Sequence, residues 1–120
     1  MPSVKIINPD DIEPMILDTE FHRDGRATHR RVITKARDGA QDMDAGVNTY
    51  KAGLEFGSYS HPNNDEICYI IEGRVTMIND GKEQELKAGD VMFRPKGAAT
   101  DNVIVHEDMK CICVFAPARD

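Results

Sequence analysis

Apolar and β-branched residues occur along the chain in short runs, and each run ends at Gly, Pro, Asn or Asp. Runs of this length and composition are typical of β-strands, and the residues that end them favour tight turns. Strands are expected at 28–36, 46–52, 66–73, 74–80, 82–88, 90–95, 102–107 and 110–116. Few helical patterns interrupt the series, so the order predicts an all-β sandwich or barrel.

Two turn signals define how neighbouring runs connect. Asn79-Asp80-Gly81 has residues suited to positive φ, and the segment 87–90 (Lys-Ala-Gly-Asp) is a second turn signal. These short connections predict an antiparallel meander and argue against βαβ units. Residues 1–45 are more polar and less regular, and we expect them to form N-terminal strands and an arm of the same single domain. Residues 46–120 are expected to form the barrel itself.

The two-residue period of a strand predicts which side chains face the interior. In the run 66–73, Glu66 and Cys68 share one face with Ile70, and Met92 shares a face with Arg94 in the run 90–95. If Glu66 points into the barrel, the polar residues expected to line its mouth are Tyr59, His61, Glu66, Arg94, Thr100 and Asn102. Such a mouth is too polar for a packed core and indicates a small-molecule site.

Charge and length exclude several classes of protein. The 120-residue chain has 15 basic and 21 acidic residues, a net charge of −6, and no Lys/Arg-rich run, which argues against nucleic acid as a partner. The start MPSVKIINPDD lacks the apolar stretch of a secretory signal, and no segment approaches the length of a membrane span. We therefore expect a cytoplasmic protein that contacts no membrane.

A basic segment stands out in this acidic chain. FHRDGRATHRR, residues 21–31, contains two histidines and four arginines. It is either a solvated loop that leads into a strand or a cationic rim that attracts an anionic substrate, and the sequence leaves both open.

The three cysteines are odd in number, and Cys111 and Cys113 are separated by a single residue, so the sequence suggests no disulfide framework. This usage fits a reducing compartment. Cys111 and Cys113 share one strand face, where buried small hydrophobic residues are favoured over zinc ligands.

Two segments resemble the motifs of the cupin superfamily. GLEFGSYSHPNNDEICYIIEG is similar to G(X)5HXH(X)3,4E(X)6G, and GDVMFRPKGAATDN is similar to G(X)5PXG(X)2H(X)3N. The residues that match are Gly53, His61, Glu66 and Gly73 in the first motif, and Gly89, Pro95 and Gly97 in the second. The resemblance implies an antiparallel jelly-roll β-barrel of the small single-domain type.

The departures from these motifs concern the metal ligands. Tyr59 and Thr100 stand where the cupin pattern has histidines, and Ile104 replaces its final asparagine. Of the usual three histidines and one glutamate, His61 and Glu66 remain as the certain donors, with Tyr59 as a conceivable third and Thr100 as a poor neutral one. No cofactor is firmly predicted, and a divalent ion (Zn, Ni, Mn or Fe) at His61 and Glu66 would be weakly held.

Relatives of this kind imply proton-transfer chemistry on a small polar substrate, with or without an anionic group. An isomerase, epimerase, dehydratase or lyase is expected, with His61, Glu66 and Tyr59 catalytic. Substrate contacts are assigned to Arg94, Thr100, Asn102, Cys68 and Met92. The alternatives are a non-catalytic ligand-binding or accessory cupin, similar to the ethanolamine-utilisation type, and a metal-dependent oxygenase. By analogy with small cupins we expect a homodimer.

Overall fold

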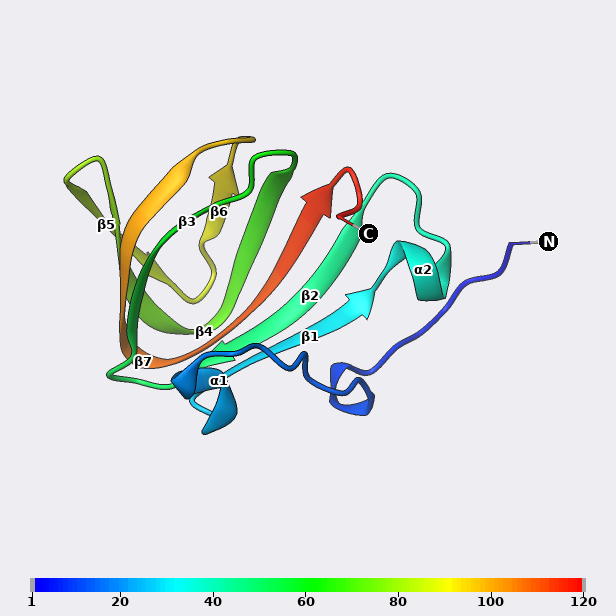
Figure 1. Cartoon of the computed structure of the whole chain (residues 1–120), viewed down its shortest axis with the longest axis horizontal. Helices are drawn as coiled ribbons and strands as arrows, with labels where there is room; N and C mark the ends of the chain where they lie inside the picture. Colours follow the sequence, from blue (N-terminus) through cyan, green and yellow to red (C-terminus); the bar gives the residue numbers. More distant parts are fainter. Residues whose placement is uncertain (1, 120) are drawn as a thin grey trace.

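The computed structural model describes residues 2–119. Their strands form one strongly curved antiparallel sheet (Figure 1). Its strands are β1 (Ala27–Ile33), β2 (Asp44–Tyr50), β3 (Glu55–Ser60), β4 (Asp65–Asn79), β5 (Lys82–Lys87), β6 (Val91–Arg94) and β7 (Ala99–Ala116). The helical turns are η1 (Pro9–Asp11), α1 (Glu20–Arg23) and α2 (Lys35–Asp38). The strand order is β1-β2-β7-β4-β5, with β3 beside β7 and β6 beside β4. The predicted antiparallel jelly roll is confirmed, although the strand order does not close on itself.

Two long strands, β4 and β7, connect both sides of the fold. They contain 15 and 18 residues and pair with each other along most of their length. The sequence predicted two strands in each of these regions, because Gly73 and the polar residues near Asp108 resemble breaks. The ladder instead continues through register shifts between Ile70 and Val75, where the strands bend. This bend turns the sheet around the interior.

Gly73 is required at this bend for two reasons. Its φ is +93°, a value that L side chains rarely adopt, and a Cβ at this position would lie 2.4 Å from the carbonyl oxygen of Asp108. The closing glycine of the first motif therefore lies where β4 approaches β7 too closely for a side chain.

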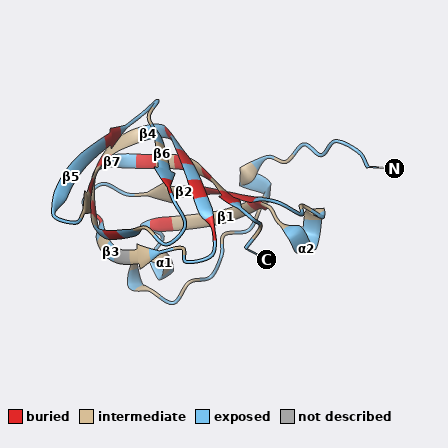
Figure 2. Ribbon diagram, turned by 90° about the horizontal axis from the view of Figure 1, so that it is seen from above, coloured by how far each residue is buried: buried red, intermediate tan, exposed pale blue. Residues whose placement is uncertain are grey.

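The inner face of the sheet holds the main core. Its buried members include Ile70 and Val75 from β4, and Val103 and Val105 from β7. A second cluster around Val32, Ala45 and Val47 lies on the other face of β1 and β2, where Ile7 and Ile12 of the N-terminal segment pack against it. Figure 2 shows buried positions along β2, β4 and β7, whereas β5 and the N-terminal end are mostly exposed.

Asp44 at the start of β2 anchors the end of the chain. It is fully buried, and its carboxylate accepts hydrogen bonds from the guanidinium and backbone N–H of Arg119. Arg31 lies 3.2 Å from the same carboxylate. Burial by itself raises the pKa of Asp44, but the hydrogen bonds and charge of Arg119 bring it below its usual value. Residues 2–119 contain no helix of the length and apolar character needed to cross a membrane.

Replacing Gly73 by Ala is expected to destabilise the fold by at least about 2 kcal/mol, because the new methyl group clashes with β7 and the backbone is strained. Gly89→Ala is the matched control, since Gly89 has φ +94° but no atom within 4 Å of an added Cβ. Its cost should be only the backbone strain, about 1 kcal/mol. Urea unfolding measures both, and equal losses in the two variants would contradict the close-contact explanation.

Candidate functional site

A cavity of about 320 Å³ lies inside the curved sheet. Its polar or ionisable lining residues are His22, His29, Asn48, Tyr50, Tyr59, Glu66 and the three cysteines. The other lining side chains are apolar or aromatic and include Phe21, Phe56, Met77, Met92 and Met109. An apolar cavity with a few convergent polar groups is the usual form of a small-molecule site.

The pairing of β4 with β6 places Glu66 directly opposite Arg94. The Nε atom of Arg94 donates to Oε1 of Glu66 over 3.0 Å, and both residues are buried, at 4% and 6% exposure. Arg94 also donates to Oη of Tyr59 over 2.8 Å and to the carbonyl oxygen of Ala98 over 3.3 Å. One guanidinium therefore fixes the carboxylate and the phenol relative to each other.

Burial changes the acidity of both groups that Arg94 holds. It raises the pKa of Glu66 above the ordinary value, and the attraction of Arg94 offsets this only in part. Burial also raises the pKa of Tyr59 to about 12. At neutral pH the phenol is therefore protonated, and the carboxyl group is a stronger base than an exposed glutamate.

His61 lies beside Glu66 but, contrary to the prediction, does not line the inner cavity. Its Nε2 is 3.8 Å from Oε1 of Glu66, and a quarter of its side chain is exposed. The ring packs edge-on against Phe115 with centroids 4.7 Å apart. Burial, reinforced by the charges of Arg119 and Arg94, lowers the pKa of His61, so the imidazole is neutral at neutral pH.

The remaining predicted substrate contacts fall in different places. Cys68 and Met92 line the cavity. Thr100 is fully buried and donates to Sδ of Met77 over 3.7 Å. Asn102, however, donates to the exposed Glu55 and does not line the cavity.

The separation of Thr100 from Asn102 has a local cause. Gly57 of β3 lies so close to β7 that a Cβ would be 2.2 Å from the carbonyl oxygen of Asp101. Around this contact the simple alternation fails, so that Thr100 and Val103 are both buried while Asn102 between them is not. Strict two-residue parity therefore does not extend through this part of β7.

In the basic segment 21–31, the arginines and the histidines have different surroundings. Three of its arginines have acidic partners: Arg23 pairs with Asp18, Arg26 with Asp24 and Arg31 with Asp44. The two histidines, by contrast, line the cavity. His29 is 3.1 Å from Oη of Tyr50, and His22 is 2.5 Å from Oγ1 of Thr19. The Nε2 atom of His22 is buried without a hydrogen-bond partner among the described residues.

Sequence reasoning did not assign Asn48, Tyr50 or Phe56 to the site. Tyr50 stacks on Phe56 with ring centroids 5.1 Å apart, and Phe56 lies 6.3 Å from Tyr59. These contacts connect the histidines of the basic segment to the Glu66–Arg94 pair through aromatic rings. The alternation of polar and apolar residues in β2 was a signal for Asn48 and Tyr50, but the partner strand was unknown.

The third group of ionisable residues is a set of three free thiols, Cys68, Cys111 and Cys113. Cys68 and Cys113 face each other across β4 and β7, and their Sγ atoms are 2.9 Å apart. Sγ of Cys111 is 3.8 Å from Sγ of Cys113. Hydrogen bonds from the other two thiols lower the pKa of Cys68. The pKa values of Cys111 and Cys113 are raised.

The donor set typical of cupins does not fit a metal here. The Arg94 guanidinium is bonded to both Glu66 and Tyr59, so it places a permanent positive charge where those two donors converge. Among the described residues, His61 and Glu66 belong to no group of three metal-binding side chains. A divalent cation at this point would be repelled by Arg94, and the oxygens of Glu66 and Tyr59 already accept hydrogen bonds from its guanidinium.

A more open hollow of about 560 Å³ lies on the side of the molecule between β5 and β6. Arg94 borders it, together with the acidic residues Asp80, Glu85 and Asp90. It is larger than the inner cavity, but neither Glu66 nor any histidine lines it. The inner cavity therefore remains the candidate site.

The chain belongs to the cupin family, because residues 46–115 match the Cupin domain. It is 26% identical over 89 residues to the polyketide synthase CurC of Streptomyces cyaneus, covering 72% of this chain and 58% of that protein. Ethanolamine utilization protein Q of Salmonella typhimurium is 28% identical, with a TM-score of 0.66 over 80% of this chain and 76% of that one. The expected likeness to this type of cupin is confirmed.

The polyketide cyclase RemF of Streptomyces resistomycificus has the same fold. Its TM-score is 0.76 at 16% identity, over 95% of this chain and 80% of that one. This chain thus shares its fold with a polyketide cyclase.

The burial of His29 predicts a pH-dependent stability. Burial, with the charges of His22 and Arg119, lowers the pKa of His29 from 6.5 to about 4. The folded state disfavours the protonated ring, so this contribution is fully present above about pH 6.5 and is lost as the pH falls toward 4, by on the order of 3 kcal/mol in total.

Urea unfolding between pH 4 and 7 measures this loss. His29→Gln should flatten the pH dependence, whereas His106→Gln should leave it unchanged, because His106 is exposed and bonds only Thr76 among the described groups. A His29→Gln variant with the full wild-type slope would show that another group causes the loss.

Proposed function

We propose that this cupin is a metal-independent acid–base enzyme that moves a proton at a carbon next to a carbonyl group of a small substrate. The observation that carries the proposal is the buried Glu66–Arg94–Tyr59 arrangement, in which a carboxylate with a raised pKa and a protonated phenol are fixed by one guanidinium. Many isomerisations, epimerisations, dehydrations and lyase reactions of carbonyl compounds begin with such a proton transfer.

Each residue has a distinct role in this proposal. Glu66 lines the cavity and acts as the general base, since its raised pKa brings it closer to the working pH. Tyr59 hydrogen-bonds the carbonyl oxygen of the substrate and stabilises the enolate that forms. Arg94 is a positioning residue, because its donors are directed to Glu66, Tyr59 and Ala98.

His61 is assigned the role of a proton relay. It lies 3.8 Å from Glu66 and is partly exposed, so one bridging water or a small side-chain shift would let it return the abstracted proton to water or to the product. The neutral form favoured by its lowered pKa can accept this proton.

The cavity also favours a class of substrate. Its walls are largely apolar and aromatic, and the unpartnered Nε2 of His22 offers a second polar contact. A compact carbonyl compound with an apolar or aromatic body suits this lining better than a sugar or a polyanion. The likeness to CurC, named as a polyketide synthase, and to the polyketide cyclase RemF agrees with an aromatic or polyketide-like substrate.

A non-catalytic ligand-binding protein is the second candidate. The observation that favours it is the ion pair itself, because a carboxylate bound to a buried guanidinium is a weaker base than a free buried one. The metal-dependent oxygenase has the least support, since the donor set around Glu66 does not fit a metal.

Solvent exchange tests the catalytic proposal without knowledge of the natural substrate. The probe is a panel of small aryl 1,3-diketones and 3-oxo acids in D₂O, and NMR follows deuterium incorporation at the carbon next to the carbonyl. We expect exchange to be accelerated by the wild-type protein and slowed about 10²- to 10⁴-fold by Glu66→Gln.

Glu72→Gln is the matched control, because Glu72 lies on the same strand and is exposed. It should exchange at the wild-type rate. If the wild-type protein binds a panel member but accelerates no exchange, the second candidate replaces the first.

We also infer a homodimer, formed through the outer face of β4 and β6. Five apolar side chains are exposed there: Ile67, Tyr69, Ile71, Val91 and Phe93. Ile67 pairs with Phe93 and Tyr69 with Val91 across the two strands, so they form one continuous patch. A patch of this kind marks an interface more often than free surface. Three free thiols agree with a reducing compartment such as the cytoplasm.

Light scattering at micromolar concentration should return twice the 13.4 kDa mass of the chain. Phe93→Glu should shift the mass to that of the monomer, because it places a charge in the centre of the patch. Met43→Glu is the control, since Met43 is exposed outside the patch. A monomeric wild-type protein would remove this inference.

A further inference from the structure

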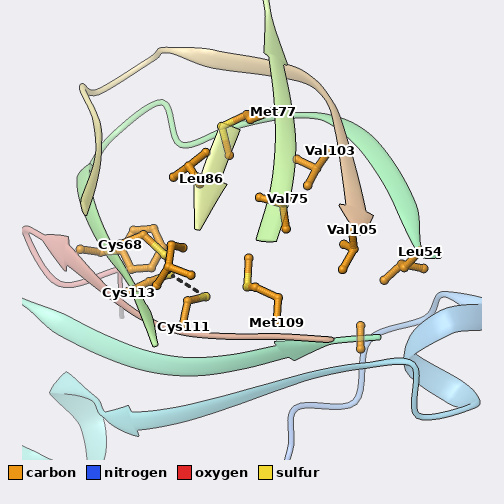
Figure 3. Packing of buried hydrophobic residues seen from close by; sticks show 13 residues of the cluster. Leu54, Cys68, Val75, Met77, Leu86, Val103, Val105, Met109, Cys111 and Cys113 are labelled. Atoms are coloured by element: carbon orange, nitrogen blue, oxygen red, sulfur yellow. Dashed lines mark hydrogen bonds between the residues drawn. The ribbon is translucent and has the colours of Figure 1, made fainter. Parts of the chain in front are cut away.

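Three thiols converge on one wall of the cavity, each from a different position in the sheet. Cys68 comes from β4, and Cys111 and Cys113 come from one face of β7. Their Sγ atoms all lie within 4.8 Å of one another, and each side chain is buried. Figure 3 shows the three sulfurs directed toward one another, with Met109 beside them.

This convergence follows from strand register. The β4–β7 ladder pairs Cys68 with Cys113 and Ile70 with Cys111. Cys111 is therefore next to Cys113 on the same face and diagonal to Cys68. Three small core residues would fill this space equally well as alanines or valines, and packing by itself does not require three sulfurs.

The distances suit a single bound ion. Thiolates bind Zn²⁺ at about 2.3 Å, which places neighbouring sulfurs of a tetrahedral site about 3.8 Å apart. Cys111 and Cys113 are 3.8 Å apart already. Cys68 and Cys113, at 2.9 Å, would have to separate by about 1 Å. A rotation of the Cys68 side chain toward the cavity supplies a movement of this size.

The surroundings are those of a thiophilic site with an open position. All three cysteines line the cavity, so an ion held by them would keep one side free for a ligand. The amide of Asn48 donates to Sγ of Cys113 over 3.7 Å. It would therefore orient the Cys113 sulfur without itself binding the ion. Met77, Met92 and Met109 add soft thioether sulfur to the cavity wall.

We propose that Cys68, Cys111 and Cys113 form a binding site for one thiophilic d¹⁰ cation, Cu⁺ or Zn²⁺, with its open coordination position facing the cavity. The site neighbours the Glu66–Arg94 pair, since Cys113 is hydrogen-bonded to Glu66, but its three donors differ from the family's histidine–glutamate set. Softness of the donors excludes Mg²⁺, Ca²⁺ and Mn²⁺ as occupants. The proposal stands whether or not Glu66 acts as a base, because it uses other side chains and a different measurement.

Metal titration of the reduced protein under anaerobic conditions tests the site. Zn²⁺ and Cu⁺ are added separately, and binding is followed by thiolate charge-transfer absorption and by elemental analysis after gel filtration. We expect one ion per chain for at least one of the two metals, and at least a 100-fold loss of affinity in Cys68→Ala, Cys111→Ala and Cys113→Ala.

His61→Gln and the exposed Glu72→Gln are the matched controls, and both should keep wild-type affinity for the metal. Absence of binding to either ion, or binding that survives the cysteine changes and is lost with His61→Gln, overturns the proposal. If a cysteine variant fails to fold, X-ray absorption of the metal-loaded wild-type protein decides. Three sulfur neighbours at about 2.3 Å are expected, and a shell of nitrogen and oxygen overturns the proposal.

Discussion

The buried ion pair between Glu66 and Arg94 is the interaction on which the organisation of this cupin depends. Its partners come from opposite positions on β4 and β6, and both are almost fully buried. Removing one member of such a pair leaves an uncompensated charge and costs about 3–5 kcal/mol. The pair therefore fixes the register of β6 on β4 and, through Tyr59, connects the edge strand β3 to the site.

Arg94 explains why the departures from the cupin metal pattern occur together. A cation at this place balances the Glu66 carboxylate, which is one of the electrostatic roles of a metal ion. Unlike a metal, the guanidinium has no vacant coordination position and cannot bind a substrate oxygen as a Lewis acid. In the proposed function the chemistry of the site is proton transfer by the residues that Arg94 holds, and burial supports it by raising the pKa of Glu66.

Much of the fold was predictable from the sequence, because the spacing of Gly53, His61, Glu66 and Gly73 carries the turn geometry of the family. Alternation also placed Glu66 and Cys68 correctly on an inward face, since β4 is regular there. It failed at Asn102, where the close approach of Gly57 to β7 interrupts the period.

The contacts between strands could not be predicted from the sequence. That Arg94 binds Glu66 and that Cys68 meets Cys113 both depend on registers between segments distant along the chain. Likewise, His22 and His29 enter the cavity while their neighbouring arginines pair with acidic residues, and composition alone does not distinguish these two outcomes.

The central claim is that Arg94 takes the place of the metal and controls the protonation of a buried Glu66. Carboxyl ¹³C NMR titration of Glu66 in the wild-type protein and in Arg94→Met tests it most directly. The account predicts a wild-type pKa above the ordinary 4.5 and a further increase in Arg94→Met, because the variant removes the positive charge and leaves the burial. A Glu66 pKa at or below 4.5, or one that Arg94→Met does not change, would contradict the account.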